Sequence, residues 1–235
     1  MRLQEVILYQ VQVDCLAFRL AEFLKSLACV AIFRFATIHK RSNTYFESLD
    51  GFRGCCLADS DHVPITDRLI VIEQVAELRV VQPNAVRWEA VDAIPGQVAI
   101  LPSALLAAAL RHRPDRIIFG EIRDECANDL LQAMNTGHGG TLTTLHAKSA
   151  WDALSRLSNL ALSARPNINH SFIRSETAEA IDFVLYCERE QSGRRRVREL
   201  ISVTGYDFAA QTFVTEDLYR ADDHTALPGI PTNAA

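Results

Sequence analysis

The sequence lacks the features that mark several common classes of protein. Its six cysteines, at positions 15, 29, 55, 56, 126 and 187, form no CxxC pair, which argues against a zinc finger or a thioredoxin-like redox centre. They are interpreted as reduced thiols of a cytosolic protein. The formal net charge is -5, so the basic balance typical of nucleic-acid-binding proteins is missing and no direct nucleic-acid site is expected.

A long apolar run is missing even from the most hydrophobic region, residues 15–35. Arg19, Glu22 and Lys25 interrupt this region at three-residue spacing, whereas a membrane span needs about 20 mostly apolar residues. The region therefore predicts an amphipathic helix and not a span or a signal peptide. What is present is a globular balance, with 235 residues, 49% of them hydrophobic and 23% charged. This length suits one domain plus a small appendage.

After residue 60, strand and helix patterns alternate along the chain. Helices are expected to begin near Ser103, Asp124 and Ser149, the last with Asp152 in a capping box. The alternation predicts an α/β fold whose sheet is covered on both faces. The pattern predicts strands at 6–13, 68–72, 85–89, 116–119 and 141–146, and a β-hairpin from 183–188 and 195–203.

Polar residues follow three of the predicted strands at the point where each strand ends. Glu73 and Glu77 follow the first, Glu121 and Arg123 follow the second, and His146 ends the third. Ligands of such sheets bind beyond the carboxyl ends of the strands. A carboxylate there can hold Mg²⁺ through water or orient an attacking water molecule. The alternative is a salt bridge at the rim of the sheet, without catalytic use.

The connection NTGHGGTLTTLHA, residues 135–147, carries two histidines and three glycines. Glycines permit close backbone approach, and an imidazole can contact a phosphate. The alternative for His138 and His146 is that each is a partly exposed histidine with ordinary partners. Zinc is not expected, because the two histidines are eight residues apart and no ligand pair has finger spacing. The basic run at 194–198 is interpreted as a solvated strand face, with a nucleic-acid site as the less favoured alternative.

The longer motifs carry a resemblance to a known family. IEQVAEL at 72–78, RPDRIIFGEIR at 113–123, LLQAMNTGHGGTLTTLHA at 130–147 and DALSRL at 152–157 occur in this order. Together they resemble the secretion ATPases, which drive type II and type IV secretion, conjugal transfer and type IV or Tad pilus assembly. The residues of these motifs are most similar to those of the conjugal-transfer and Tad-like branch. The resemblance runs from about residue 57 to 206. It implies a RecA-like P-loop NTPase core, incomplete at its N-terminal side, with a C-terminal β-hairpin.

The resemblance assigns roles to the carboxylates. IEQVAEL is similar to the family's acidic box, with Glu73 and Glu77 at its acidic positions and one of them as the water-activating base. Gln74 stands where the family normally has Asp, which lowers the local negative charge. GEIR is similar to the Walker B region, so Glu121 is expected to be the carboxylate on the magnesium side, acting through water.

The resemblance also assigns roles to imidazole and guanidinium groups. GHGGTLTTLHA is similar to the family's histidine box, so His138 and His146 are expected to sense the γ-phosphate. Arg87 and Arg123 match basic positions of the family, where each touches either phosphate or a neighbouring subunit.

Cofactors and partners follow from the resemblance alone. It implies Mg²⁺ and ATP, and a homo-oligomer, normally a hexameric ring. It places that ring on the cytoplasmic side of the inner membrane, bound peripherally to the platform proteins of a secretion or pilus system. A mixed ring with intact paralogues is the alternative assembly.

One element that this family requires is missing from the sequence. No Gly-Lys-Ser/Thr occurs anywhere, although the loop GxxxxGK[ST] grips the phosphates in P-loop enzymes. Its expected place is about residues 40–56, where Gly51, Arg53 and Gly54 remain. Losing two hydrogen bonds to charged groups weakens binding by about 3–6 kcal/mol, or about 10²–10⁴-fold. The chain is therefore predicted to hydrolyse ATP weakly or not at all.

Several interpretations of this absence stay open. Residues 1–56 match no recognised part of the family and are left unassigned, as a truncated or frame-shifted gene would explain. Residues 57–206 are the predicted motor domain, and 207–235 a strand and a loose tail. The chain is an impaired motor, a non-catalytic assembly subunit of the same machine, or a gene remnant. An active enzyme that grips phosphate through Arg53 or a neighbouring chain is a further alternative.

Overall fold

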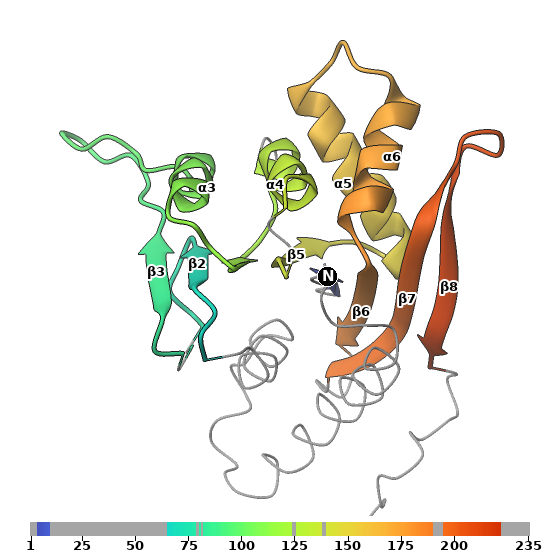
Figure 1. The fold of residues 1–235 in the computed structure, drawn as a ribbon, viewed down its shortest axis with the longest axis horizontal. Helices are drawn as coiled ribbons and strands as arrows, with labels where there is room; N and C mark the ends of the chain where they lie inside the picture. Colours follow the sequence, from blue (N-terminus) through green and yellow to red (C-terminus); the bar gives the residue numbers. More distant parts are fainter. Residues whose placement is uncertain are drawn as a thin grey trace, which may run out of the picture.

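The structure is a computed structural model that describes residues 4–9, 65–78, 80, 82–123, 126–137, 140–189 and 195–221 (Figure 1). For residues 4–9, 189, 195 and 196 it describes the backbone alone. The described strands form one eight-stranded sheet in the order β3-β2-β4-β5-β1-β6-β7-β8. The predicted amphipathic helix at 15–35 and the tail after Ala221 lie outside the described residues.

The first half of the sheet is parallel, as the sequence predicts. Its strands are β2 (Leu69–Glu73), β3 (Ala85–Glu89), β4 (Arg116–Phe119) and β5 (Leu142–His146), and each pairs in parallel with its neighbours in this half. All five residues of β2 are buried. A strand buried on both faces explains the continuous apolar run, because no position of such a strand meets solvent.

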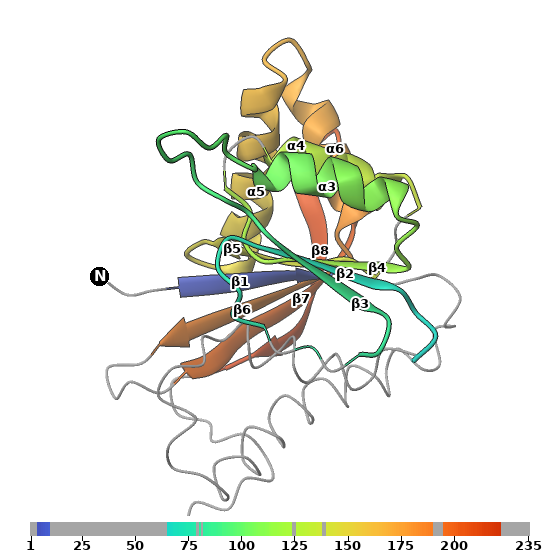
Figure 2. The same cartoon turned by 90° about the vertical axis from the view of Figure 1, so that its left-hand side faces the viewer.

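The four described helices lie on one side of the sheet (Figures 1 and 2). They are α3 (Pro102–Arg111), α4 (Cys126–Asn135), α5 (Ala150–Ala164) and α6 (His170–Ala180). Their apolar faces share a core with alternate residues of the strands, among them Ile70, Ile117 and Phe119. The other alternate strand residues, Leu69, Val71, Ile118 and Leu142, form a second buried cluster with Leu78.

Helix α3 corrects one detail of the sequence prediction. Ser103 is not its N-cap, because Leu101 holds that position and Pro102 comes first in the helix. Proline suits the first helical position, where its missing N–H has no intrahelical partner to lose. The prediction of Ser149 as the N-cap of α5 is confirmed, since its side chain accepts a hydrogen bond from the amide of Asp152.

The second half of the sheet is antiparallel. The predicted hairpin is confirmed, because β6 (Phe183–Arg189) pairs antiparallel with β7 (Arg195–Asp207). Strand β8 (Thr212–Arg220) extends this half by pairing antiparallel with β7. The turn residues 190–194 lie outside the described residues. Helix α6 was missed by sequence reasoning, since HSFIRSETAEA has few large apolar residues and a weak helical stripe.

The two halves meet at β1 (Gln4–Tyr9), the first of the described strands. It lies between β5 and β6 and runs antiparallel to both. The sequence predicts this strand at 6–13, so the predicted start is two residues too late and the predicted end four residues too late. Its central position in the sheet was not foreseen.

Candidate functional site

The carboxyl ends of β2, β4 and β5 lie side by side and bring together residues from three predicted motifs. Glu73 ends β2 and His146 ends β5. Glu121 follows β4, and its Oε1 lies 3.2 Å from Nε2 of His146. Residues 25 positions apart in the sequence are thus in contact, as expected where parallel strands share an edge. We call Glu73, Glu77, Glu121, Arg123 and His146 the carboxyl-edge site.

The backbone around Glu121 is held by both neighbouring strands. The amide of Gly120 donates to the carbonyl of Ile72 at 2.8 Å, and the amide of Ile122 donates to the carbonyl of Thr144 at 2.8 Å. The hydroxyl of Thr144 donates to the carbonyl of Gly120 at 2.7 Å. A Cβ at Gly120 would lie 3.3 Å from the carbonyl oxygen of Ile72, so glycine permits the close approach. These hydrogen bonds from the neighbouring strands therefore fix the backbone position of Glu121.

The carboxylate of Glu121 has a basic partner on each oxygen. Arg123 donates to Oε2 at 2.6 Å, and His146 contacts Oε1. The Arg123 side chain is 57% exposed and that of Glu121 is 25% exposed, so the pair meets solvent and is worth only about 0–1 kcal/mol. The rim salt bridge that the sequence offered as the alternative reading is present. The predicted phosphate contact of Arg123 stays a prediction.

Glu73 is more deeply placed than the other acidic residues of the site. Its side chain is 6% exposed, and its Oε1 accepts the amides of Glu77 and Leu78, both at 3.0 Å. These bonds fold the chain after β2 into a tight turn that presents Glu77 at the surface. The geometry supports Glu77, more than Glu73, as the residue of this pair that can approach a water molecule. Both catalytic assignments stay predictions.

Arg87 is tied to the same turn. It lies on β3 and donates a hydrogen bond to the carbonyl of Leu78, while its guanidinium lies 3.8 Å from Oε2 of Glu73. The amide of Ala76 in this turn donates to Glu89, at the end of β3, at 2.7 Å. The end of β3 therefore braces the acidic turn. The predicted phosphate contact of Arg87 stays a prediction.

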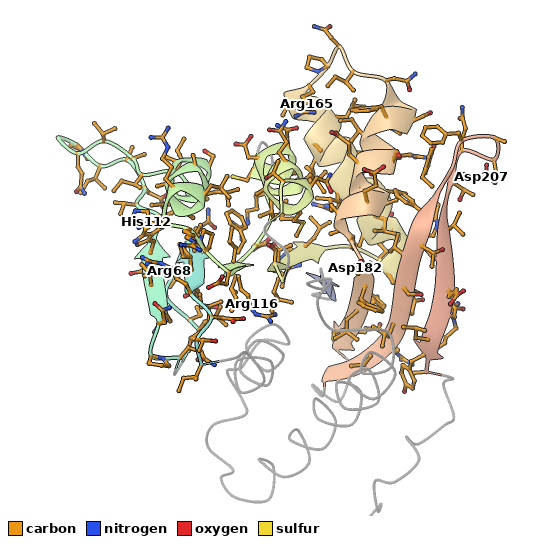
Figure 3. The ribbon with its side chains drawn as sticks, in the orientation of Figure 1. Arg68, His112, Arg116, Arg165, Asp182 and Asp207 are labelled. Atoms are coloured by element: carbon orange, nitrogen blue, oxygen red, sulfur yellow. The ribbon has the colours of Figure 1, made fainter. Side chains whose placement is uncertain are left out.

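His138 and Gly139 lie outside the described residues, but Gly137 and Gly140 on either side of them are described. Gly137 and Gly140 belong to the connection that enters the amino end of β5, whereas His146 stands at the carboxyl end. Gly140 has φ +82°, and a Cβ there would lie 3.0 Å from the guanidinium of Arg116, the first residue of β4. Arg116 is labelled in Figure 3. The histidine motif thus spans both edges of the sheet.

The amino end of α5, which follows His146 closely, is already occupied by side chains of the protein. Ser149 accepts the amide of Asp152 at 3.0 Å, and Asp152 accepts that of Lys148 at 3.1 Å. Glu199, from β7, accepts the amide of Ala150 at 2.8 Å. A helix amino end binds anions through such amides. Here a carboxylate takes the amide of Ala150 and a hydroxyl takes the amide of Asp152.

Comparison with known proteins decides the family. Residues 58–185 match the family described as "Type II/IV secretion system protein", and this match covers more than half of the chain. The chain belongs to the type II/IV secretion system protein family. The RecA-like core expected from the sequence is therefore confirmed, together with the antiparallel C-terminal strands.

Members of this family with assigned names resemble the chain over its central part. A "Conjugal transfer protein TrbB" of Rhizobium radiobacter is 41% identical over 140 residues, which are 60% of this chain and 40% of that protein. A "Type IV secretion system protein VirB11" of Bartonella quintana is 34% identical over 140 residues, 59% of this chain and 39% of that protein. The chain thus spans about two fifths of these relatives.

One solved structure of the family supports the fold directly. The VirB11 ATPase of the Brucella suis type IV secretion system, solved in complex with sulphate, matches with a TM-score of 0.52 and 30% identity. The match covers 60% of this chain and 41% of that one. The type II/IV secretion family assignment therefore rests on both sequence and structure.

The described residues contain neither a ready-made metal centre nor a membrane-spanning helix. Within them, no group of three or more His, Cys, Asp or Glu side chains is arranged to hold a metal ion. Mg²⁺ that accompanies a nucleotide needs only one or two carboxylates, because phosphate and water supply the other ligands. Glu121, partly exposed at the edge, fits that role. None of the helices described is long and apolar enough to cross a membrane.

Sequence reasoning missed several residues that shape the site. Thr144 and Gly120 fix the backbone beside Glu121, and Glu199 caps α5 from a distant strand. Thr144 lies in a motif that the sequence singled out only for its histidines. Nothing in the sequence links Glu199 to α5, since the contact joins residues 49 positions apart.

Proposed function

We propose that this chain is a motor-domain subunit of a conjugal-transfer or type IV secretion machine, and that its carboxyl-edge site holds MgATP weakly. The contact of Glu121 with His146 carries the proposal, because it joins the Walker B-like and histidine motifs at the ligand-binding edge of a secretion-family sheet. The relatives' names support the machine class.

The residues divide the work of nucleotide hydrolysis by position. Glu121 would hold Mg²⁺ through water, which spreads the negative charge that develops on the phosphates. Glu77, exposed on its turn, would orient and deprotonate the attacking water. His146 and Arg123 flank Glu121 and would donate hydrogen bonds to the γ-phosphate when it displaces them from the carboxylate.

The grip on the remaining phosphates is the weak part of the site. The sequence carries no Gly-Lys-Ser/Thr. At the nearby helix α5, the amides of Ala150 and Asp152 donate to Glu199 and Ser149, and the amide of Lys148, just before the helix, donates to Asp152. Nucleotide affinity is therefore expected in the range between sub-millimolar and millimolar, on the same estimate of about 10²–10⁴-fold lost binding.

Thermal unfolding with MgATP tests the proposal. ATP at about ten times its Kd stabilises a folded protein by about 1.4 kcal/mol, which raises the Tm of a chain of this size by about 3–6 °C. We expect this saturable rise in the wild type at millimolar MgATP. The variant Glu121→Gln should lose it together with any ATP hydrolysis.

The chain offers a matched control for that variant. Glu176 pairs with Arg165 at 3.4 Å, and its side chain is 24% exposed, close to the 25% of Glu121. Arg165 lies at the end of α5 far from the sheet (Figure 3). Glu176→Gln should keep the full response to MgATP. An equal response of the two variants, or a response to magnesium alone, would rule the proposed site out.

A second candidate function is a non-catalytic subunit in a mixed ring. The missing Gly-Lys-Ser/Thr favours it, since a chain that binds ATP poorly can still occupy a place beside intact paralogues. Such a ring would associate with platform proteins at the cytoplasmic face of the inner membrane. Co-expression with a P-loop-bearing paralogue should then yield one complex on size exclusion, whereas separate elution would reject this function.

A further inference from the structure

The sheet contains a position one strand wide between β5 and β6. Strand β1 fills it and pairs on both sides, with Glu5 opposite His146 of β5 and opposite Cys187 of β6. Helix α5 contacts both flanking strands. Without β1, β5 and β6 would each present an unpaired edge in the middle of the sheet, a pairing template for other strands.

The direction of β1 differs from that of the strands around it. Since β5 and β6 are both antiparallel to β1, they run parallel to each other and to β2 and β4. Residue Tyr9 pairs with Leu142 and Phe183, the first residues of β5 and β6. The chain therefore leaves β1 at the amino edge of the sheet, four residues or about 13 Å from the end that carries His146.

The direction of β1 decides whether a phosphate-binding loop that follows it can reach the carboxyl-edge site. A phosphate loop follows the carboxyl end of a strand and opens a helix, so that its amides point at the ligand. The strand position beside β5 adjoins the carboxyl-edge site, but only a strand parallel to β5 would end there. A loop after β1 starts on the wrong edge.

The sequence of β1 suits this position. Residues 6–9 read Val-Ile-Leu-Tyr, a continuous apolar run of the kind found in central strands covered on both faces. A frame-shifted segment would match the pattern and length of a central strand position only by chance. The match favours residues 4–9 as part of the fold.

We propose that β1 is a reversed strand that closes the sheet and excludes a phosphate-binding loop from the position beside β5. The inference rests on the proposed function, because it concerns the nucleotide site at the carboxyl edge. It adds that restoring the missing motif after β1 cannot restore tight nucleotide binding. The phosphates must therefore be bound by a segment that does not follow β1.

The direction of β1 can be tested in the full chain with one substitution. Directly opposed residues of antiparallel strands have Cα atoms about 4.5–5.5 Å apart, which lies within disulfide range. Glu5→Cys places a thiol opposite the native Cys187. Mild oxidation should give an intramolecular disulfide between positions 5 and 187, identified by peptide mass spectrometry.

Val6→Cys is the matched control. Position 6 lies opposite Tyr186, and successive side chains of a strand point to opposite faces. It should therefore not react with Cys187. A parallel β1 would move position 5 away from Cys187. Absence of the 5–187 disulfide, equal yields in both variants, or a disulfide that joins two chains would overturn the proposal.

A graft tests the functional consequence. A GxxxxGKT segment inserted directly after Gln10, in the Glu5→Cys background, should leave the 5–187 disulfide and the small MgATP shift of the wild type unchanged. A larger shift that disappears when the grafted Gly-Lys is changed to Ala-Ala would overturn the inference while supporting the proposed site. If the graft fails to fold, the disulfide in the ungrafted chain still decides. If Glu121→Gln kept the MgATP-dependent rise in Tm, that result would contradict the proposed function but not the direction of β1.

Discussion

Replacing Glu73 by alanine tests whether this residue is a structural support of the acidic turn. The carboxylate accepts the amides of Glu77 and Leu78 and is 6% exposed. The Leu78 amide is buried, so loss of its acceptor costs about 1–3 kcal/mol, while the more accessible Glu77 amide loses about 0.5–1.5 kcal/mol. We expect Glu73→Ala to lower the free energy of unfolding by about 1.5–4.5 kcal/mol.

Urea unfolding followed by circular dichroism measures this change. Glu73→Gln should fall between the wild type and Glu73→Ala, because an amide oxygen still accepts both hydrogen bonds but carries no charge. Glu77→Ala is the control on the same turn, since its exposed side chain should change stability by no more than about 0.5 kcal/mol.

The opposite ranking would refute the structural reasoning. If Glu73→Ala unfolds at the same urea concentration as Glu77→Ala, the two hydrogen bonds of Glu73 do not support the turn. Hydrolysis adds an independent readout, because Glu77→Gln should remove residual activity without changing stability. Activity that survives in Glu77→Gln but not in Glu73→Gln would assign the base to Glu73 instead.

Three further outcomes are expected. Ser149→Ala should lower the free energy of unfolding by about 1 kcal/mol, because it removes the N-cap of α5. Ser163→Ala, a change at an exposed position in the last turn of α5, should leave urea unfolding nearly unchanged. Gly140→Ala should lower the free energy of unfolding by about 1–3 kcal/mol more than Gly137→Ala. Both glycines have positive φ, but a Cβ at 140 would crowd Arg116, whereas a Cβ at 137 meets nothing within 4 Å. Equal melting temperatures of the two variants would contradict this. Thr144→Val should reduce the MgATP-dependent rise in Tm while costing about 1 kcal/mol of stability through one lost hydrogen bond, and an unchanged nucleotide response would show that the bond does not position the site.

The central sheet was predictable because its strands carry strong local signals. Leu69–Glu73 and Arg116–Phe119 are short apolar runs that end in polar residues, and both are observed as parallel strands. The meeting of Glu121 with His146 followed from one topological rule, that the carboxyl ends of parallel strands share an edge. For these elements, pattern and position were enough.

Other features depend on contacts between distant segments, which no local pattern reveals. The place of Gln4–Tyr9 between β5 and β6 depends on pairing with residues more than 130 positions away. Helix α6 is polar by composition and is held by its packing against α5, α4 and β7. The hydrogen bonds of Glu73 could not be foreseen, because they depend on how the following turn closes. The sequence of an acidic motif alone does not show which carboxylate stabilises the turn and which one can act as a general base.

The central place of the earliest strand affects how the protein is made. At a synthesis rate of about 5–20 residues per second, Gln4–Tyr9 leaves the ribosome about 10–40 s before the second of its two neighbours. Until both β5 and β6 have emerged, the pairing of β1 stays incomplete, and its apolar residues are exposed to aggregation or chaperone capture. The sheet can be completed only after β8 has emerged, so the yield of folded protein in the cell should depend on chaperones more than that of a domain whose paired strands follow one another in the sequence.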